Sequence, residues 1–499
     1  MKIKALLYFV VAILLVSCVA TKNKKYTFNQ KYSATKIKED IILLKQILEA
    51  NHPSLYWHTP KDSINYYFTE TLATITDSLT ETQVKNKIAA TIAHLKCGHT
   101  SVRFSKQFMA LADKNKFPQF PLSIKTWADS LVVIGIYNLA DSALQRGSVI
   151  TSINGRKSKD IIDNMMQYIS TDGNSINFKS QVLTNNFPAW YRNIFSVDSL
   201  FHIEYLDTLH QPKSITITSY NPKKDTAKSK IDTAKKNAIV KIKKITKKEK
   251  KATKLLAYRS FIIDTASSTA FIKLATFSKG NLKHFFRKSF KTTRQMHLKN
   301  MVFDIRENGG GRVDNFLNLT NYLKKDSYKI GDTVAAISRA YHFKKYIQGW
   351  LPYWVLAKLT STKMEDGLFH NSTYETELFS PKIKNHFDGN IYIIQGGYTF
   401  SAATMFAATL KGQQNVTLVG EETGGGYYGN TAMHIPAIIL PNTKLKVSLP
   451  MYRLVMDKTR PKGRGIMPDI YISPSADAIK KGIDLKMMEV KKLIKERSN

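Results

Sequence analysis

Cysteine and acidic residues are both scarce in this sequence. Its 499 residues include only two cysteines, Cys18 and Cys97, which give no support for a disulfide-stabilised scaffold or a zinc site. Asp and Glu number 38 against 75 Lys and Arg, so the formal net charge is +37. An apolar run near the N-terminus covers only residues 5–16, which is too short to span a bilayer comfortably. We therefore expect neither a disulfide framework nor a resident metal or other cofactor.

The N-terminal segment is typical of an export signal. Lys2 and Lys4 precede the apolar run, which fits the apolar region of a signal peptide. Residues 15–18 read L-V-S-C and resemble the bacterial lipobox, which implies cleavage before Cys18 and lipidation of its thiol. A plain signal peptide or an N-terminal membrane helix are the alternatives. We expect residues 1–18 to be a lipoprotein signal peptide, and the protein to be an exported lipoprotein anchored to a membrane of the cell envelope.

The positive charge is partly concentrated in one segment. Residues 223–254 contain fourteen lysines against Asp225, Asp232 and Glu249, and no aromatic residue. Such a composition cannot bury much apolar surface, so residues 222–256 are interpreted as a solvated, mobile insertion. Binding of this segment to anionic lipid or another polyanion is the alternative. No nucleic-acid partner is expected, because no nucleic-acid motif accompanies the lysines.

Two regions of different character precede this insertion. Residues 26–48 and 62–96 carry apolar residues at helical spacing, and we expect residues 26–115 to form an N-terminal helical domain. Residues 116–221 show short β-branched runs. Within them, residues 147–155 read G-S-V-I-T-S-I-N-G and resemble the core of PDZ domains, with Ser148 in the usual place of Asp. The resemblance implies a domain that binds an extended peptide at a sheet edge; any small β-barrel with a tight turn is the alternative.

Strands and helices alternate in residues 257–480. Residues 269–274 and 300–306 are predicted strands, and residues 281–297 and a run from Val313 are predicted helices. This βαβ alternation indicates an α/β core. An aromatic-rich insertion before Asn390 is predicted to be a helical hairpin, with a lid or a groove wall as the alternative.

A strand, a Gly-rich turn and a helix meet at Ser401. The β-branched run 390–395 is followed by G-G-Y-T-F-S and then by small residues at helical spacing up to Lys411. This arrangement puts the Ser401 hydroxyl at the positive end of a helix dipole, where a developing anion is stabilised. A simple helix cap, formed by Ser401 or Thr399, is the alternative.

Four short motifs follow one another in the second half of the chain. Residues 304–311 read D-I-R-E-N-G-G-G, residues 401–403 read S-A-A, residues 419–426 read V-G-E-E-T-G-G-G, and residues 465–470 read G-I-M-P-D-I. In this order they resemble the motifs of the S41 serine peptidases, the tail-specific and tricorn-core group. The match extends over most of residues 90–475. It implies an α/β fold with a ClpP/crotonase-like βαβ peptidase core, beside the PDZ-like β domain and the N-terminal helical domain.

The resemblance also implies roles for individual residues. Ser401 becomes the nucleophile. The Ser–Lys dyad of one branch of the family is not expected, because Gly426 occupies the position of the Lys. Residues 98–100 (G-H-T) match the segment that supplies a His in the other branch, so His99 becomes the expected base, a structural histidine being the alternative. The oxyanion hole is expected from the N–H groups of Gly310 and Ala402.

The acid that orients the histidine cannot be chosen from the sequence. In the tricorn-like pattern a Glu precedes the last motif, but residues 462–464 read K-G-R here. Glu421, Glu422 and Asp457 remain as candidates.

The expected function is a serine endopeptidase that hydrolyses peptide bonds of envelope proteins or peptides without a cofactor. A non-catalytic peptide-binding member of the same fold is the alternative, since the Lys and the Glu of the family are both missing. A surface-attached polyanion binder that uses the Lys-rich segment is a third possibility.

Overall fold

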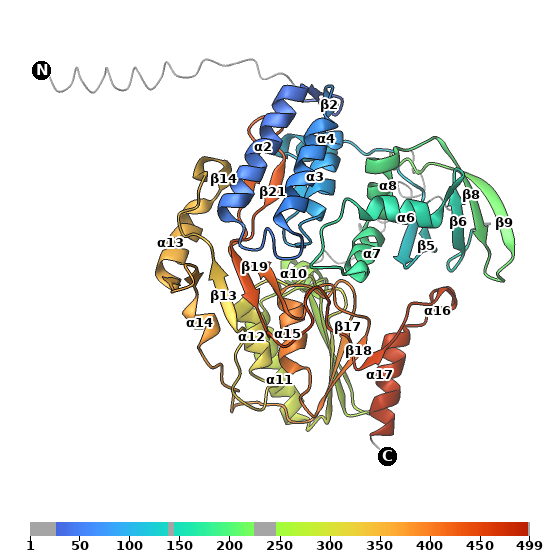
Figure 1. The fold of residues 1–499 in the computed structure, drawn as a ribbon. Helices are drawn as coiled ribbons and strands as arrows, with labels where there is room; N and C mark the ends of the chain where they lie inside the picture. The colour runs from blue at the N-terminus through green and yellow to red at the C-terminus, as the bar shows by residue number, and fades with distance from the viewer. Residues whose placement is uncertain (1–25, 138–143, 224–245, 498–499) are drawn as a thin grey trace, which may run out of the picture.

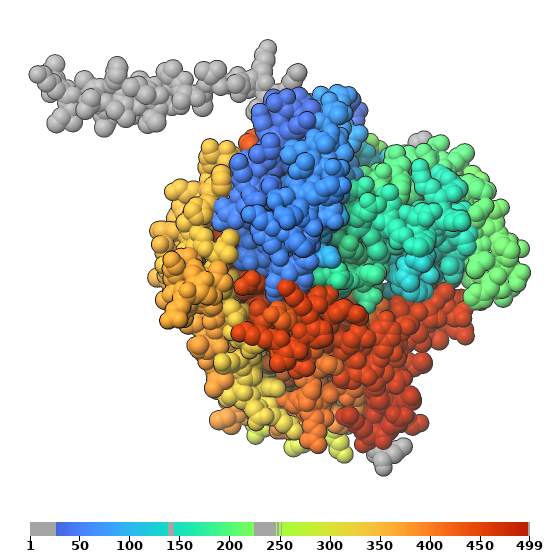
Figure 2. Space-filling view, in the orientation of Figure 1, coloured from blue at the N-terminus to red at the C-terminus, as the bar shows by residue number. Residues whose placement is uncertain are grey.

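The computed structural model describes residues 26–137, 144–223 and 246–497. The expected signal peptide, Cys18 and the greater part of the Lys-rich segment lie outside these residues. Helices at the N-terminus, a β-rich region and a larger α/β region lie against one another (Figure 1). Figure 2 shows the N-terminal residues (blue) in contact with both the β-rich region (teal) and the C-terminal part of the chain (red).

The N-terminal region contains four helices and a short strand pair. It contains α2 (Ala34–Asn51), α3 (Lys61–Ala73), α4 (Glu81–Ala93) and α5 (Lys106–Lys114), with a short strand pair β1 (Lys31–Tyr32) and β2 (Leu79–Thr80). In α2 the buried residues Ile37, Ile41, Leu44 and Leu48 recur every three or four positions and form one apolar face. A capping box between Thr80 and Gln83 begins α4.

The β-rich region is a sheet with strand order β4-β5-β6-β8-β9, and β7 pairs with β6. The strands are β4 (Leu122–Trp127), β5 (Ser130–Ile136), β6 (Val149–Ile153), β7 (Arg156–Lys157), β8 (Leu200–Leu206) and β9 (Pro212–Thr218). Asn154 and Gly155 both have positive φ, which forms the predicted tight turn between β6 and β7. The helices of this region are α6 (Ser158–Met166), α7 (Ile176–Asn185) and α8 (Phe187–Phe195).

A sheet with order β10-β11-β12-β17-β18-β23 forms the α/β core. The strands are β10 (Arg259–Asp264), β11 (Thr269–Leu274), β12 (Asn300–Asp304), β17 (Asn390–Gln395), β18 (Val416–Gly420) and β23 (Ile470–Tyr471). All neighbours except β10 and β11 are parallel. The α/β prediction is confirmed, and β12 ends at Asp304, two residues before the expected end.

Both faces of this sheet are covered, as parallel sheets require. On one face pack α11 (Leu282–Gln295), α12 (Val313–Thr320) and α15 (Ala402–Leu410); Met301 and Phe303 belong to this layer. On the other face, Val302 packs with Val490 and Ile494 of α17 (Leu485–Glu496). Successive side chains of β12 thus point alternately into two apolar layers.

Two smaller sheets connect distant parts of the chain. One has order β15-β16-β13-β22-β19 and the other β14-β20-β21-β3. Their strands are β3 (Val102–Arg103), β13 (Thr333–Ala336), β14 (Ile347–Gln348), β15 (Thr362–Lys363), β16 (Phe369–His370), β19 (Gly429–Ala432), β20 (Ala437–Ile439), β21 (Lys446–Ser448) and β22 (Tyr452–Val455). The pairing of β3 with β21 fastens the end of the N-terminal region to the core.

Helix α10 (Lys247–Leu256) forms the end of the Lys-rich segment and begins with a capping box between Thr246 and Glu249. The expectation that this segment is a solvated, mobile insertion stays a prediction. The aromatic-rich insertion is not a helical hairpin: a 3₁₀ turn (Lys344–Tyr346) and β14 precede its helix α13 (Trp350–Thr360), and β15 and β16 follow. Tyr353 of this helix lines an apolar pocket beside Ser401. Among the described helices, none has the length and the apolar composition to cross a membrane.

Candidate active site

Ser401 lies in the turn between β17 and α15, partly exposed. Its backbone adopts φ 53° and ψ −125°, a conformation that costs a non-glycine residue of order 1–3 kcal/mol. The surrounding loops hold it there: the Thr399 hydroxyl donates to Ile305 O at 3.0 Å, and Phe400 N donates to Asn308 O at 3.0 Å. The serine is therefore presented by a strained turn rather than by an ordinary helix cap, and it makes no side-chain cap hydrogen bond.

Gly310 approaches Ser401 more closely than any other residue type could. It has φ 95°, and a Cβ at this position would lie 2.7 Å from both Phe400 O and Ser401 Cβ. Its N–H already donates to Asn308 Oδ1 at 2.9 Å, so in this structure that donor is occupied. Ala402 is the first residue of α15, and no carbonyl of the helix can accept its N–H.

His99 comes from the loop between α4 and β3. The Gly98 N–H donates to Asp172 Oδ1 at 2.8 Å, and Thr100 Oγ1 lies 2.9 Å from His52 Nε2, so the loop is held on both sides of the histidine. The next residues form β3, which pairs with β21 of the core. Packing of this loop against three distant segments sets the position of His99.

His99 and Ser401 line the same cavity, of about 510 Å³, together with Gly310, Tyr398 and Phe400. The ring of Phe400 lies beside the imidazole, with ring centroids 4.7 Å apart. Neither ring nitrogen of His99 has a hydrogen-bond partner in the structure, so no hydrogen bond joins it to Ser401. Buried polar atoms are rarely left unpaired, and active sites are a recognised exception.

The carboxylate beside His99 is that of Asp172, which sequence reasoning missed. Asp172 Oδ1 lies 3.8 Å from His99 Nδ1, and both side chains are buried. The chain around it reads T-D-G-N, which looks like an ordinary turn, so no sequence signal separates this Asp from others. Asp172 lies at the site because Gly173 N donates to Lys96 O and Asn174 N donates to Gly463 O.

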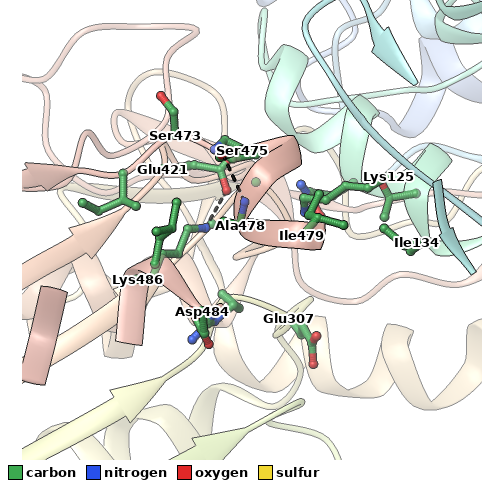
Figure 3. Close-up of a pocket in the computed structure, with 18 of the residues that line it drawn as sticks. Lys125, Ile134, Glu307, Glu421, Ser473, Ser475, Ala478, Ile479, Asp484 and Lys486 are labelled. Atoms are coloured by element: carbon green, nitrogen blue, oxygen red, sulfur yellow. Dashed lines mark hydrogen bonds and ion pairs between the residues drawn. The ribbon is translucent and has the colours of Figure 1, made fainter. Parts of the chain in front are cut away.

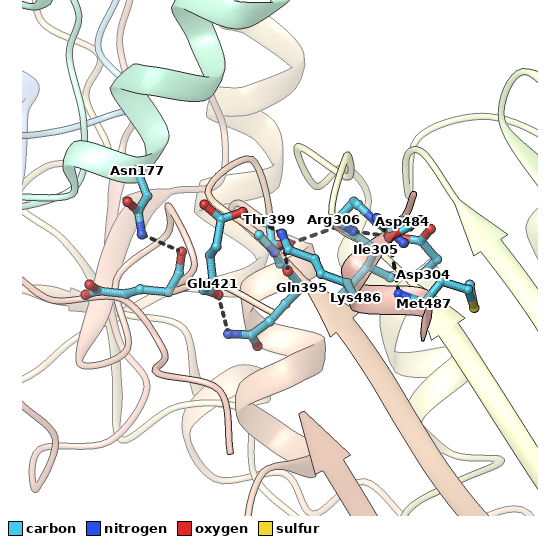
Figure 4. Close-up of polar contacts among 12 residues, drawn as sticks. Asn177, Asp304, Ile305, Arg306, Gln395, Thr399, Glu421, Asp484, Lys486 and Met487 are labelled. Carbon is cyan, nitrogen blue, oxygen red and sulfur yellow. Dashed lines mark hydrogen bonds and ion pairs between the residues drawn. The ribbon is translucent and has the colours of Figure 1, made fainter. Parts of the chain in front are cut away.

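The three carboxylates proposed from the sequence pair with other groups. The carboxylate of Glu421 pairs with Lys486, while its backbone oxygen accepts from Gln395 Nε2 (Figure 4). Glu422 accepts from Arg464 and from Gly465 N. Asp457 accepts from Thr459 and Arg460. These contacts hold the loops of the core together.

A second, more enclosed pocket of about 390 Å³ also borders Ser401. Ser401 and Ala402 form part of its wall. Most of its lining is apolar or aromatic: Ile330, Tyr353, Tyr374, Met405, Met433 and Leu454. His434 also faces the pocket, and burial lowers its pKa to about 4, so it is neutral there at physiological pH. A pocket of this composition favours an apolar side chain.

A third cavity, of about 640 Å³, lies between the β-rich region and the C-terminal helices (Figure 3). Its charged groups largely pair with one another: Lys486 with Glu421, and Arg306 with Asp484. Lys125 also faces it, and burial lowers the pKa of this ammonium group. The cavity shares Ala275 and Tyr398 with the one at Ser401, so it extends the site toward the β-rich region.

Within the described residues, no cluster of three or more His, Cys, Asp or Glu side chains is arranged to hold a metal ion.

The core is similar to a known protein family. Residues 268–472 match the model of peptidase family S41. The matched residues make up about two fifths of the chain, and they include Ser401 but not His99 or Asp172. A search of the curated proteins found no match to the chain.

Solved structures share the fold over nearly the whole chain. The crystal structure of mature CPAF superposes with a TM-score of 0.63 at 13% identity, covering 92% of this chain and 97% of that one. A serine-to-alanine mutant of CPAF gives 0.65 at 12% identity, covering 93% and 97%. Mature CPAF complexed with lactacystin gives 0.62 at 13% identity, covering 92% and 98%. At this identity the likeness concerns the mixed α/β fold alone.

Proposed function

We propose that this protein is a serine endopeptidase with Ser401 as nucleophile and His99 as general base. The observation that carries the proposal is that Ser401 and His99, about three hundred residues apart in the sequence, line one cavity. The match to peptidase family S41 supports a peptide or protein as the substrate. The strained backbone of Ser401 supports the role of nucleophile, since such strain clusters at active sites.

In the proposed reaction, Ser401 Oγ attacks the carbonyl carbon of the scissile peptide bond. The proton of the hydroxyl passes to Nε2 of His99, because Nδ1 is the ring nitrogen nearer Asp172. The N–H of Ala402 donates to the resulting oxyanion, and the positive end of α15 adds to this stabilisation. His99 then returns the proton to the leaving amine, and water hydrolyses the acyl-enzyme with the same base.

Gly310 takes a modified role in this proposal. Its N–H reaches the oxyanion only after it leaves Asn308 Oδ1, so the hole is completed when substrate is bound. Catalytic hydrogen bonds that tighten only in the complex are common, which also accounts for the absence of a bond between His99 and Ser401 here.

The apolar pocket beside Ser401 suggests the substrate preference. A large apolar residue next to the scissile bond would fill it and displace water from Met405, Met433 and Leu454. We also propose that the β4–β9 sheet is a PDZ-like domain that holds an extended peptide, and that envelope proteins are the substrates of a protein anchored through Cys18.

A non-catalytic peptide-binding protein is the second candidate, favoured by the missing hydrogen bond at His99. Substitution separates the two. Ser401→Ala and His99→Ala should each abolish hydrolysis of an unfolded protein substrate, and the double variant should be little worse than either, because the two groups act as a unit. Full activity in Ser401→Ala would refute the nucleophile. An inactive parent that still binds peptide would establish the second candidate.

A further inference from the structure

Helix α13 in the aromatic-rich insertion exposes an unusually apolar face. Leu351, Val355 and Leu359 are 53%, 42% and 78% exposed, and they follow one another at four-residue intervals, so they form one row. Leu356 beside the row is 45% exposed. Soluble proteins rarely expose a contiguous apolar patch of this kind without a binding partner. Figures 1 and 2 show α13 at the edge of the molecule, away from the β-rich region.

The opposite face of α13 fixes the helix to the core. Ala357 is 2% exposed, and Tyr353 packs against His434 with ring centroids 5.5 Å apart. Trp350 and Trp354 are partly buried against the same apolar layer. Apart from Lys358 and Thr360, the helix is therefore apolar on both faces, although its outer face is open to solvent.

Lysine residues flank the exposed row. Lys344 and Lys345 precede α13, Lys358 lies within it and Lys363 follows it, and the first acidic residues after the helix are Glu365 and Asp366. Lys344 lies over the ring of Trp350 at 5.1 Å, and Lys358 lies over that of Trp354 at 6.0 Å. Tryptophan and lysine beside a leucine face are the features of helices that lie in a membrane interface.

We propose that α13 inserts its Leu351–Leu359 row into the surface of an anionic lipid bilayer. A helix of eleven residues is about 17 Å long, which is too short to cross a bilayer but suits a helix that lies in the headgroup region. The lysines pair with anionic headgroups and the leucines enter the acyl boundary. Because Tyr353 of the same helix lines the pocket beside Ser401, the membrane surface then lies next to the site. This surface is independent of the proposed lipid at Cys18 and of the proposed peptidase activity.

A fluorescent probe at Leu356 tests the proposal. We would prepare residues 19–499, which lack both Cys18 and the apolar run at residues 5–16, with Leu356→Cys, label the new thiol with an environment-sensitive dye, and add phosphatidylcholine vesicles with or without phosphatidylglycerol. Cys97 is buried, and burial raises its pKa to about 12, so it stays unlabelled. The emission should shift to the blue with anionic vesicles, and the binding should be more than about tenfold weaker with neutral ones.

Two matched variants identify the contact. The same dye at Leu209→Cys, which is 72% exposed in the β8–β9 turn, should not shift, because that turn is not part of the proposed surface. Leu351→Gln with Leu359→Gln should lower the vesicle affinity of the Leu356-labelled chain by more than about tenfold. Thermal unfolding of this variant should match that of the parent, since both side chains are exposed.

Three results would overturn the proposal. One is an unshifted probe at Leu356 in anionic vesicles. Another is a shift that needs only a higher protein concentration, which would mean that α13 contacts a second copy. The last is a shift caused by an unfolded protein substrate without vesicles, which would make α13 a cover for the site.

Discussion

Asp172 Oδ1 lies 3.8 Å from Nδ1 of His99, and both side chains are buried. The same oxygen accepts the N–H of Gly98 at 2.8 Å, so this carboxylate holds the loop that carries the histidine. The carboxylate nearest His99 therefore comes from the β-rich region, not from the segment before residues 465–470.

Replacing Asp172 by Asn tests whether it positions the base. Asn keeps an oxygen for the Gly98 N–H but loses the negative charge that stabilises a protonated His99. We expect kcat to fall by about 10²–10⁴ while KM stays nearly constant, since the effect arises in the transition state. Steady-state kinetics measure kcat and KM separately. A lower melting temperature with an unchanged kcat would show that Asp172 only stabilises the loop that carries His99.

Gly310→Ala should abolish activity through a steric effect. Its Cβ would lie 2.7 Å from Phe400 O and from Ser401 Cβ, so the turn that carries Ser401 would have to move. Gly412→Ala is the matched control, because Gly412 also has positive φ but a Cβ there meets nothing within 4 Å. It should cost about 1 kcal/mol of stability and leave activity intact. Equal activities of the two variants would show that a close approach of Gly310 to Ser401 is not needed for activity.

Ala432→Leu should narrow the apolar pocket beside Ser401. Ala432 lies at the end of β19, lines this pocket and is 8% exposed, so the larger side chain would take up part of its volume. We expect kcat/KM to fall about tenfold or more for peptides with Phe or Leu next to the scissile bond, and to change little for peptides with Ala there. Peptide cleavage followed by mass spectrometry measures kcat/KM for the Phe or Leu peptides relative to that for the Ala peptides. If this ratio is the same in Ala432→Leu and in the parent, the pocket does not determine the specificity.

Acid should destabilise the protein through His52. Burial lowers the pKa of His52 to about 4, from about 6.5 in the unfolded chain. Between these values the unfolded state binds more protons, so the free energy of unfolding falls as the pH drops from about 6.5 to about 4, by up to about 3 kcal/mol. His52→Gln should be less stable at neutral pH but should show a flatter pH dependence. Urea unfolding at several pH values measures how the free energy of unfolding depends on pH. The same dependence in the parent and in His52→Gln would contradict the role of His52.

Lipidation of Cys18 remains a prediction from the L-V-S-C sequence. Mass spectrometry of the protein purified from membranes should find a diacylglyceryl group on Cys18 at the mature N-terminus. Cys18→Ala should block both the lipid and the cleavage that follows it. A free thiol at Cys18, or a mature N-terminus at another residue, would refute the anchor.

The sequence by itself determined the local architecture of the core. The β-branched runs at 269–274 and 390–395, the glycines between them and the small residues after Ser401 each reflect short-range preferences, and they predicted the strand-turn-helix order. The tight turn at Asn154 and Gly155 was likewise predicted from the sequence, because Asn and Gly adopt positive φ more readily than other residues.

Only the tertiary structure decided which groups surround Ser401. His99 could be proposed from a resemblance, but its approach depends on the β3–β21 pairing and on the loop contacts of Gly98 and Thr100. Asp172 had no sequence signal, and the apolar pocket combines residues from well-separated segments of the chain. Local preferences act over a few residues, whereas a catalytic site depends on contacts between segments hundreds of residues apart, and those contacts form only when the whole core packs.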